Sequence, residues 1–254
     1  MPDQEKSGIF SHLSKMKNKI IKVGCCGFPI NKKEYYKKFD LVELQSTFYQ
    51  LPAKIETVRK WREEAPKDFI FSLKAWQLIT HPASSPTYKR LKEKILKPEN
   101  YGFFKPTKEV FEAWQRIKEV AKALAAKIIV FQSPASFKPI KENIENLRKF
   151  FKKEKNKTFI FAWEPRGKWE EDLIKNLAKE LNLVHCVDPF KQKSTFGKIN
   201  YFRLHGKPGY NLRYEYNEGD LKELLKFCDK KENYVLFNNL SMLKDALKFK
   251  FLIK

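Results

Sequence analysis

Residues that commonly bind metals or form disulfides are scarce in this 254-residue sequence, which has only four cysteines and four histidines. The cysteines, at positions 25, 26, 186 and 228, form no C-x-x-C pair or other metal-binding spacing, as is typical of a reducing compartment. No apolar run approaches membrane-spanning length, and residues 1–19 lack the apolar stretch of a secretory signal. We therefore expect a soluble, cytoplasmic protein with no membrane partner.

Acidic residues are too few to balance the basic ones. The chain has 30 Asp and Glu against 52 Lys and Arg, a net charge of +22. A surface with this excess attracts polyanions, and nucleic acid is the commonest abundant one. We therefore expect a nucleic acid or a phosphate-bearing small molecule as the partner. Lysine-rich surfaces also serve solubility or thermal stability, and this alternative stays open.

Short apolar segments alternate with amphipathic stretches along the chain. Eight segments are typical of buried parallel strands, at 20–24, 41–44, 69–74, 127–131, 158–163, 184–188, 199–204 and 234–237. Helical periodicity covers residues 107–124, 139–151, 169–182, 218–228 and 242–249. Pro139 suits a first helical turn, and Asn217 and Ser241 are candidate N-caps.

This alternation predicts an α/β protein with a TIM-like (β/α)₈ barrel. The competing arrangement, a doubly wound open sheet, would need a glycine-rich phosphate turn after the first strand. Residues 24–28 read Gly-Cys-Cys-Gly-Phe, which does not match GxGxxG. Because no composition shift marks a boundary, we predict one barrel domain over residues 20–254, preceded by a flexible or peripheral segment at residues 1–19.

The longest predicted connection, residues 75–106, is rich in proline and aromatic residues. Connections of this length commonly act as lids or binding loops. This one also carries a basic cluster beside Tyr88, which we define as Lys89, Arg90, Lys92 and Lys94. If the net charge serves a nucleic acid, these four residues are the expected contact, and the alternative is an ordinary solvated turn.

Polar residues occur where each predicted strand ends, and Glu43 even interrupts an apolar one. In a barrel the carboxyl ends of all strands meet at one mouth, where active sites of this fold lie. We therefore predict one site at that mouth, formed by Glu43, Tyr49, Lys74, His81, Gln132, Glu164, Arg166, Asp188, Arg203, His205, Asn238 and Asn239.

Most of these residues lie in short motifs that follow one another from about residue 20 to the C-terminus. Examples are Val-Glu43-Leu-x-Ser-Thr-Phe-Tyr-x-Leu-Pro, Glu164-Pro-Arg, Val-Asp188-Pro and Arg203-Leu-His-Gly. Nine such motifs in this order resemble the DUF72 family, also called YecE-like proteins. The resemblance implies a TIM-like barrel with a polar pocket, and it implies no particular reaction. The chain departs from the family's first motif, because Cys25 and Cys26 stand where serine is common.

The predicted site supports acid–base chemistry. Crowded carboxylates can be driven to different pKa values, so we predict catalytic roles for Glu43, Glu164 and Asp188. His205 is the fourth catalytic candidate, because a histidine titrates near neutral pH. The alternative for the carboxylates is ion pairing with nearby cations, and the alternative for His205 is a structural hydrogen-bond network.

The remaining predicted residues are candidates for substrate binding. Lys74, Arg166 and Arg203 can hold a phosphate, the two arginines with paired hydrogen bonds. Three rings, Tyr49, Trp76 and Tyr210, are candidates for stacking on a base or sugar. His81, Gln132, Asn238 and Asn239 complete the binding set.

A divalent metal on the three carboxylates and His205 is possible but not favoured, because the multi-histidine cluster of hydrolytic zinc sites is missing. Buried inert thiols are commoner than nucleophilic ones, so Cys25 and Cys26 are not our candidates. Two classes of function remain. The first is an enzyme, a hydrolase or lyase, acting on a phosphorylated or nucleic-acid-derived substrate. The second is a non-catalytic nucleic-acid-binding barrel. Three carboxylates in one site disfavour this second class, because a site that only binds phosphate avoids a concentration of negative charge.

Overall fold

The computed structural model describes residues 19–154 and 158–254, so the predicted peripheral segment lies almost wholly outside the described residues. Eight strands alternate with helices: β1 (Ile21–Cys25), β2 (Leu41–Leu44), β3 (Ile70–Lys74), β4 (Ile128–Ser133), β5 (Ile160–Pro165), β6 (Val184–His185), β7 (Ile199–Leu204) and β8 (Glu232–Phe237). Each of them overlaps one predicted strand. The predicted barrel is thereby confirmed.

The strands form one parallel sheet in the order β6-β5-β4-β3-β2-β1-β8-β7. A single parallel bridge between Val187 and Phe202 joins the two outer strands, which nearly closes the sheet into a barrel. The prediction for the sixth strand, residues 184–188, was too long. Only Val184 and His185 form a ladder, because the chain leaves β5 there and meets β7 only at the bridge.

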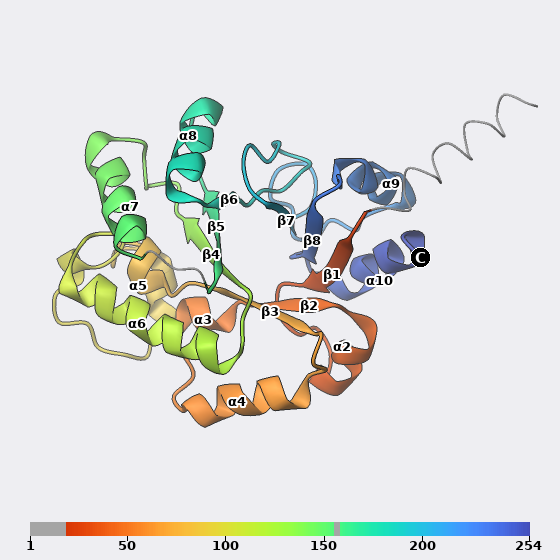
Figure 1. Cartoon of the computed structure of the whole chain (residues 1–254), viewed down its shortest axis with the longest axis horizontal. Coiled ribbons are helices and arrows are strands. Elements are labelled where there is room, and N and C mark those ends of the chain that lie inside the picture. Colours follow the sequence, from red (N-terminus) through yellow and green to blue (C-terminus); the bar gives the residue numbers. More distant parts are fainter. Residues whose placement is uncertain (1–18, 155–157) are drawn as a thin grey trace, which may run out of the picture.

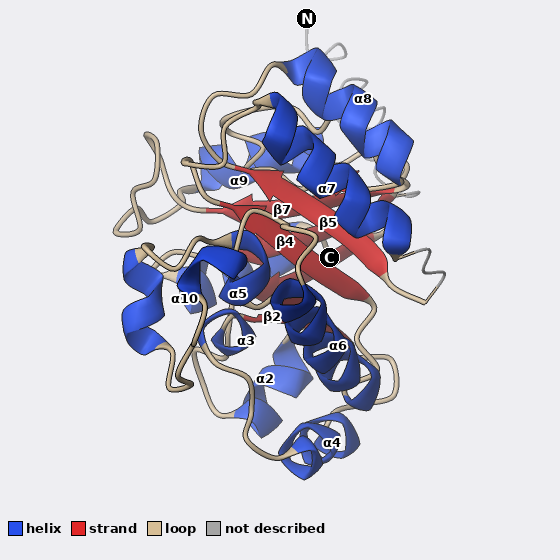
Figure 2. Cartoon of the chain, turned by 90° about the vertical axis from the view of Figure 1, so that its left-hand side faces the viewer, coloured by secondary structure: helices blue, strands red, loops and turns tan. Residues whose placement is uncertain are grey.

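The helices surround the strands, as Figures 1 and 2 show. They are α2 (Lys32–Lys38), α3 (Ser46–Tyr49), α4 (Ile55–Glu64), α5 (Gln77–Thr80), α6 (Lys108–Ala123), α7 (Lys141–Lys153), α8 (Glu171–Leu181), α9 (Glu218–Phe227) and α10 (Met242–Leu252), with short 3₁₀ turns η1 (Pro86–Arg90) and η2 (Pro98–Asn100). The connection from β6 to β7, whose residues are all described, contains no helix.

Helix ends agree in part with the sequence. Asn217 caps α9 in a reciprocal capping box with Asp220, as predicted. Ser241 is the N-cap residue of α10, but its side chain makes no capping hydrogen bond. Pro139 lies before α7 instead of in its first turn. Helices α2, α3, α4 and α5 were not predicted. Helix α2 has seven residues and α3 and α5 have four each, which is too short for a helical period to show, and α4 buries only Val58.

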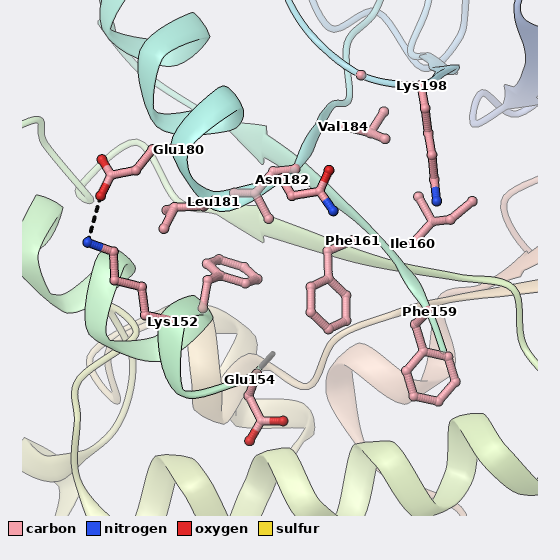
Figure 3. Close-up of a pocket in the computed structure, with 13 residues that line it drawn as sticks. Lys152, Glu154, Phe159, Ile160, Phe161, Glu180, Leu181, Asn182, Val184 and Lys198 are labelled. Carbon is pink, nitrogen blue, oxygen red and sulfur yellow. Dashed lines mark ion pairs between the residues drawn. The ribbon is translucent and has the colours of Figure 1, made fainter. Parts of the chain in front are cut away.

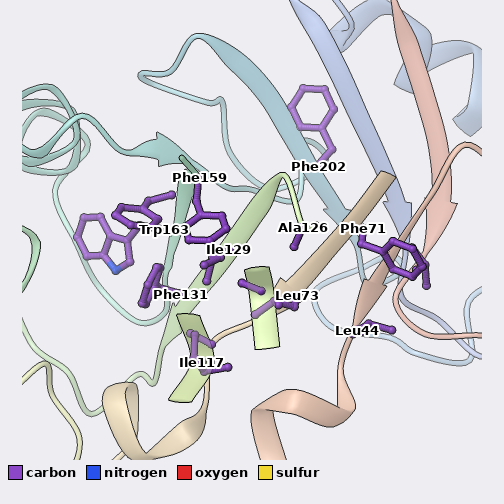
Figure 4. Close-up of a cluster of buried hydrophobic side chains, with 14 of the residues drawn as sticks. Leu44, Phe71, Leu73, Ile117, Ala126, Ile129, Phe131, Phe159, Trp163 and Phe202 are labelled. Carbon is purple, nitrogen blue, oxygen red and sulfur yellow. The ribbon is translucent and has the colours of Figure 1, made fainter. Parts of the chain in front are cut away.

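The buried apolar side chains form two clusters, one on each side of the sheet. Side chains between the sheet and the helices include Leu73, Ile129, Phe131 and Trp163, which gather in one core (Figure 4). The second cluster fills the barrel interior with residues of the opposite strand alternation: Cys26, Leu41, Ile128, Val130, Ala162, Val184, Cys186, Ile199, Tyr201, Tyr234 and Leu236. The inside of the barrel is therefore a packed core, and a site can form only at its ends. None of the helices in the described ranges is both long and apolar enough to cross a membrane.

Candidate functional site at the carboxyl ends of the strands

The polar residues at the barrel mouth continue the inward-facing alternation of the strands. Leu41, Ala162 and Tyr201 belong to the interior cluster. Two residues further along the same strands come Glu43, Glu164 and Arg203. Glu43, Lys74, Glu164, Asp188 and Arg203 are each at most 6% exposed. The strand geometry thus stacks a buried layer of charge directly on the apolar layer.

Arg203 is the centre of this charged layer. Its Nη2 lies 2.9 Å from Oε1 of Glu43, and its Nη1 donates to Oε2 of Glu164. Glu43 also accepts from the Tyr201 hydroxyl at 2.9 Å and from Gln45 at 2.8 Å. With 1% exposure, Arg203 holds two carboxylate partners inside the barrel, and its Nε has no hydrogen-bond partner among the described residues. This arrangement favours ion pairing over substrate binding for Arg203, and charge anchoring over proton transfer for Glu43.

Glu164 connects the buried layer to the surface. Its Oε1 lies 2.5 Å from Nη2 of Arg166, while its other oxygen accepts from Arg203. Burial alone would raise the pKa of Glu164, but the guanidinium groups of Arg203 and Arg166 hold that pKa well below its usual range. Glu164 is therefore ionised at neutral pH and orients Arg166 at the mouth.

His205 and Asp188 form a pair beside Arg166. Asp188 Oδ2 accepts from the backbone N–H of His205 at 2.9 Å and lies 3.5 Å from the ring Nδ1. The other ring nitrogen, Nε2, lies 3.2 Å from Nη2 of Arg166. Burial lowers the pKa of His205, although Asp188 and Glu164 oppose the shift. The histidine is therefore neutral at pH 7, with the Asp188 carboxylate near its Nδ1 and the Arg166 guanidinium near its Nε2.

A pocket of about 530 Å³ lies at the carboxyl ends of β3 to β7, and Glu164, Arg166 and Asp188 line it, whereas His205 and Arg203 do not. Five of the predicted site residues line it directly: His81, Gln132, Glu164, Arg166 and Asp188. The connection after β3 contributes Ser85 and Thr87 as well, so the long loop borders the pocket. The size suits a small ligand.

Lys191 and Tyr210 cover one side of this pocket. The Lys191 ammonium lies 2.8 Å from the centroid of the Tyr210 ring, and the Arg166 guanidinium lies 4.0 Å from it. The same ring meets His205 edge to face at 4.9 Å. Lys191 is exposed, but partial desolvation of its ammonium, together with the charge of Arg166, lowers its pKa to about 8. Sequence reasoning missed Lys191, Ser85 and Thr87, and the only signal for Lys191 was its position three residues after Asp188.

Glu43, Lys74, Arg203 and His205 are buried and do not line the pocket, and four further predicted residues also lie away from its lining. The Tyr49 ring stacks on Arg90, with 3.5 Å between guanidinium and ring centroid. Asn239 donates to Asp245 of α10 at 2.6 Å and to a carbonyl of the β7–α9 connection, so it ties α10 to that connection. Asn238 is half-buried after β8, and Trp76 is fully buried in the core. For Asn239 and Trp76 these contacts favour structural roles.

His81 lines the pocket without being a candidate acid. Burial, together with the charges of Lys74 and Arg166, lowers its pKa to about 3. Its Nδ1 lies 2.8 Å from the hydroxyl oxygen of Thr80. His81 is therefore a neutral hydrogen-bonding group at any physiological pH.

The first loop offers no reactive thiol. Cys25 and Cys26 are both buried, and burial raises the pKa of Cys25 to about 12 and that of Cys26 well above its usual range. A protonated, inaccessible thiol is a poor nucleophile. Within residues 19–154 and 158–254, no three His, Cys, Asp or Glu side chains converge as a metal site would require.

A second pocket, of about 250 Å³, lies at the opposite end of the barrel, where β5 and β6 begin (Figure 3). Its wall includes Phe159, Phe161 and Val184, and the ion pair of Lys152 and Glu180, 2.9 Å apart, lies at its edge. None of the predicted site residues lines it. Active sites of this fold occupy the carboxyl ends of the strands, so we assign the functional site to the other pocket.

A parallel barrel with a charged pocket at the carboxyl ends of its strands defines a protein of the TIM-barrel class. The chain belongs to the family described as "Protein of unknown function DUF72", whose model matches residues 32–252. The family membership that the motifs indicated is thereby confirmed.

Solved structures agree with this assignment of the fold. A DUF72 family protein from Enterococcus faecalis V583 is 22% identical, with a TM-score of 0.69 over 92% of this chain and 98% of that chain. One from Thermotoga maritima MSB8 is 23% identical, with a TM-score of 0.68 over 92% and 99% of the two chains. A xylose isomerase domain containing protein from Salmonella typhimurium LT2 is 12% identical, with a TM-score of 0.57 over 91% and 95%. Comparison with curated proteins gave no significant match.

Proposed function

We propose that this protein is an enzyme that binds a small phosphate-bearing molecule in the barrel-mouth pocket and transforms it by acid–base chemistry. The observation that carries the proposal is the placement of two cations, Arg166 and Lys191, on one pocket beside the His205–Asp188 pair. Hydrolysis and elimination are the reaction classes that such a pair can serve, so the enzyme is a hydrolase or a lyase.

Arg166 has a free donor for an anion. Its Nε is buried and has no hydrogen-bond partner among the described residues. Buried N–H groups are rarely left unpaired in proteins, so such a group favours a ligand that accepts from it. Arg166 also lines the pocket, and its partner Glu164 fixes the orientation of the guanidinium plane.

His205 is the proton-transfer group in this proposal. An arginine can only donate, so the contact with Arg166 makes Nε2 the acceptor and leaves the proton on Nδ1, which lies 3.5 Å from Asp188 and has no hydrogen-bond partner among the described residues. A substrate phosphate that draws Arg166 away frees the Nε2 lone pair for use as a base. Asp188 then stabilises the imidazolium that forms. Glu43 and Glu164 hold the arginines and take no proton.

The binding half of the proposal is tested by calorimetric titration with ribose 5-phosphate, using ribose as the uncharged control. We expect R166M and K191M each to weaken ribose 5-phosphate binding by tenfold or more, because each removes a cation from the pocket. H205Q keeps the cations and should retain most of the affinity. Equal binding of ribose and ribose 5-phosphate would contradict the phosphate site.

The catalytic half needs a reaction, which can be sought by incubating the protein with a mixture of sugar phosphates and following the mixture by NMR. Any turnover found in wild-type protein should be lost in H205Q while substrate binding persists. Turnover that is unchanged in H205Q would exclude His205 as the proton-transfer group.

A further inference from the structure

Lys74 is a buried lysine at the mouth of the barrel. It is the last residue of β3 and lies two residues after Ser72, whose hydroxyl contacts the interior residue Tyr201 at 2.7 Å. Strand alternation therefore directs Lys74 into the barrel interior, and its exposed fraction is 6%. A lysine in this position requires an explanation, because isolated buried charges are costly.

The Lys74 ammonium has no polar partner within residues 19–154 and 158–254. Its Nζ lies over the Phe48 ring, 3.7 Å from the ring centroid. The two carboxylates at this level are already engaged by arginines, Glu43 by Arg203 and Glu164 by both Arg203 and Arg166. Lys74 thus remains outside the ion-pair network that neutralises the rest of the charged layer.

Lys74 does not itself line the pocket, but two of its neighbours do. Lys74 pairs in register with Val130 of β4, and Gln132, two residues further on the same inward alternation, lines the pocket. His81, which follows β3, also lines it and is close enough for the charge of Lys74 to affect its pKa. A ligand held by Arg166 would therefore have Lys74 on its inner side.

We propose that Lys74 is a nucleophilic amine that forms a Schiff base with the carbonyl carbon of a phosphate-bearing aldehyde or ketone. The inference rests on the proposed function, since Arg166 and Lys191 hold the phosphate, and it narrows the substrate to a carbonyl compound. It also favours a lyase over a hydrolase, because an iminium withdraws electrons from the neighbouring carbon.

The covalent step is balanced without an oxidant or reductant. The nitrogen lone pair attacks the carbonyl carbon, the C=O π pair moves to oxygen, and a proton passes from nitrogen to that oxygen. The resulting carbinolamine takes one proton from solvent and loses its hydroxyl as water, which leaves an iminium ion. For a lyase step, His205 takes the proton of a hydroxyl on the second carbon from the iminium carbon. The bond between that carbon and the carbon next to the iminium carbon breaks, which releases an aldehyde, and its electron pair converts the iminium to an enamine. The enamine takes the proton back from His205 on carbon, and water adds to the iminium so formed and releases the carbonyl product, the free amine and a proton.

Protonation distinguishes Lys74 from the surface lysines. Burial and the charge of Arg203 lower the pKa of Lys74 to about 7, so about half of it is the nucleophilic free amine at pH 7. An ordinary lysine, with a pKa of about 10.4, is neutral in roughly one molecule in 2,500 at that pH. This difference gives Lys74 an advantage of roughly a thousandfold in free amine.

Reductive trapping tests the proposal. The folded protein is incubated at pH 7 with glyceraldehyde 3-phosphate and sodium cyanoborohydride, and the adducts are located by peptide mass mapping. We expect an adduct on Lys74 with at least tenfold higher occupancy than on an exposed lysine such as Lys108. In urea the preference should vanish, because unfolding restores an ordinary amine. Adducts confined to Lys191, surface lysines and the amino terminus would overturn the proposal.

Two comparisons separate this inference from the proposed function. K74R keeps a cation but cannot form the Schiff base, so it should retain binding of glycerol 3-phosphate, which has no carbonyl group, and should lose activity in any turnover assay. If Lys74 is not trapped while ribose 5-phosphate still binds through Arg166, the Schiff base is excluded and the phosphate site stands. Lys74 could instead be trapped equally by glyceraldehyde and by glyceraldehyde 3-phosphate, with neither yield changed in R166M. That result would support Lys74 as the nucleophile and exclude the phosphate site.

Discussion

Nη2 of Arg166 lies 3.2 Å from Nε2 of His205, and the same nitrogen lies 2.5 Å from Oε1 of Glu164. One guanidinium nitrogen thus joins the ionised carboxylate of the buried layer to the neutral imidazole at the pocket. In the proposed function, Arg166 is therefore the group through which the charge of a ligand would act on His205. Any anion that moves Arg166 changes the proton affinity of the histidine.

Removal of Arg166 should therefore raise the pKa of His205. In R166M the positive charge and the hydrogen bond to Nε2 are both lost, while Asp188 and Glu164 still favour the imidazolium. We expect an NMR titration of the histidine rings to show His205 below 6.5 in wild-type protein and higher in R166M. H205Q identifies the resonance. K191M leaves Arg166 in place and should titrate like wild type, and an unchanged His205 pKa in R166M would refute the coupling.

Arg203 should matter for stability and little for ligand affinity. Replacement by Met leaves Glu43 and Glu164 buried without their shared cation, and breaking a buried pair costs about 3–5 kcal/mol. We expect urea unfolding at pH 7 to show R203M destabilised on this scale. The fraction that remains folded should bind ribose 5-phosphate with unchanged affinity, whereas K191M should show the reverse pattern. Lost affinity in folded R203M would restore Arg203 as a phosphate ligand.

Strand alternation explains why much of the site could be predicted from sequence. Glu43, Glu164 and Arg203 end apolar strands, and closure of the barrel then forces their side chains into one layer. The pattern of eight strands in the sequence predicted this closed barrel. The family motifs pointed to the same positions, which is why the charged layer was predicted as a unit.

The contacts that could not be predicted from sequence are those between side chains far apart along the chain. No local pattern shows that Arg203 takes two carboxylates from β2 and β5, or that Asn239 turns toward α10. Lys191 was missed because the loop after β6 carries no periodicity, and only the folded chain brings its ammonium to the Tyr210 ring. These contacts join segments far apart in sequence, so spacing carries no information about them.

Burial of Lys74 should make stability depend on pH in a specific direction. Its pKa is about 7 in the folded protein against an ordinary value of 10.5, so between these pH values the unfolded chain binds more protons. The free energy of unfolding should therefore rise with pH from about 7 to 10.5 at this site, by about 1.4 kcal/mol per pKa unit. The variant K74M has a side chain of similar length with no titratable group, so this pH-dependent loss of stability should be absent from it.

The measurement compares urea unfolding of wild-type protein and K74M across pH 6 to 10. We expect K74M to be the more stable by a few kcal/mol at pH 7, with the difference shrinking as the pH rises. K67M, at an exposed lysine, controls for loss of one surface charge. A difference that does not vary with pH would show that Lys74 keeps an ordinary pKa in the folded state.

The net charge of +22 leaves open a nucleic-acid partner, and the basic cluster of Lys89, Arg90, Lys92 and Lys94 is where we expect such contact. All four residues are exposed on or just after η1, in the connection that also supplies Ser85 and Thr87 to the pocket. Phosphate contacts release counterions, so log affinity should fall linearly with log salt, by about 0.9 per contact on duplex DNA and about 0.7 on a single strand.

Labelled single-stranded and duplex RNA and DNA, titrated over a range of salt concentrations, test this prediction. We expect sequence-independent binding at low salt, and a smaller salt slope when all four cluster residues are replaced by Gln. A matched variant with four exposed lysines changed to Gln at the far end of the chain, Lys226, Lys230, Lys231 and Lys254, has the same net charge as the cluster variant. If both variants lose affinity equally, the binding follows net charge alone and the cluster has no special role. If wild-type protein does not bind at low salt, the charge serves the surface only, and the small phosphate-bearing ligand remains the partner to seek.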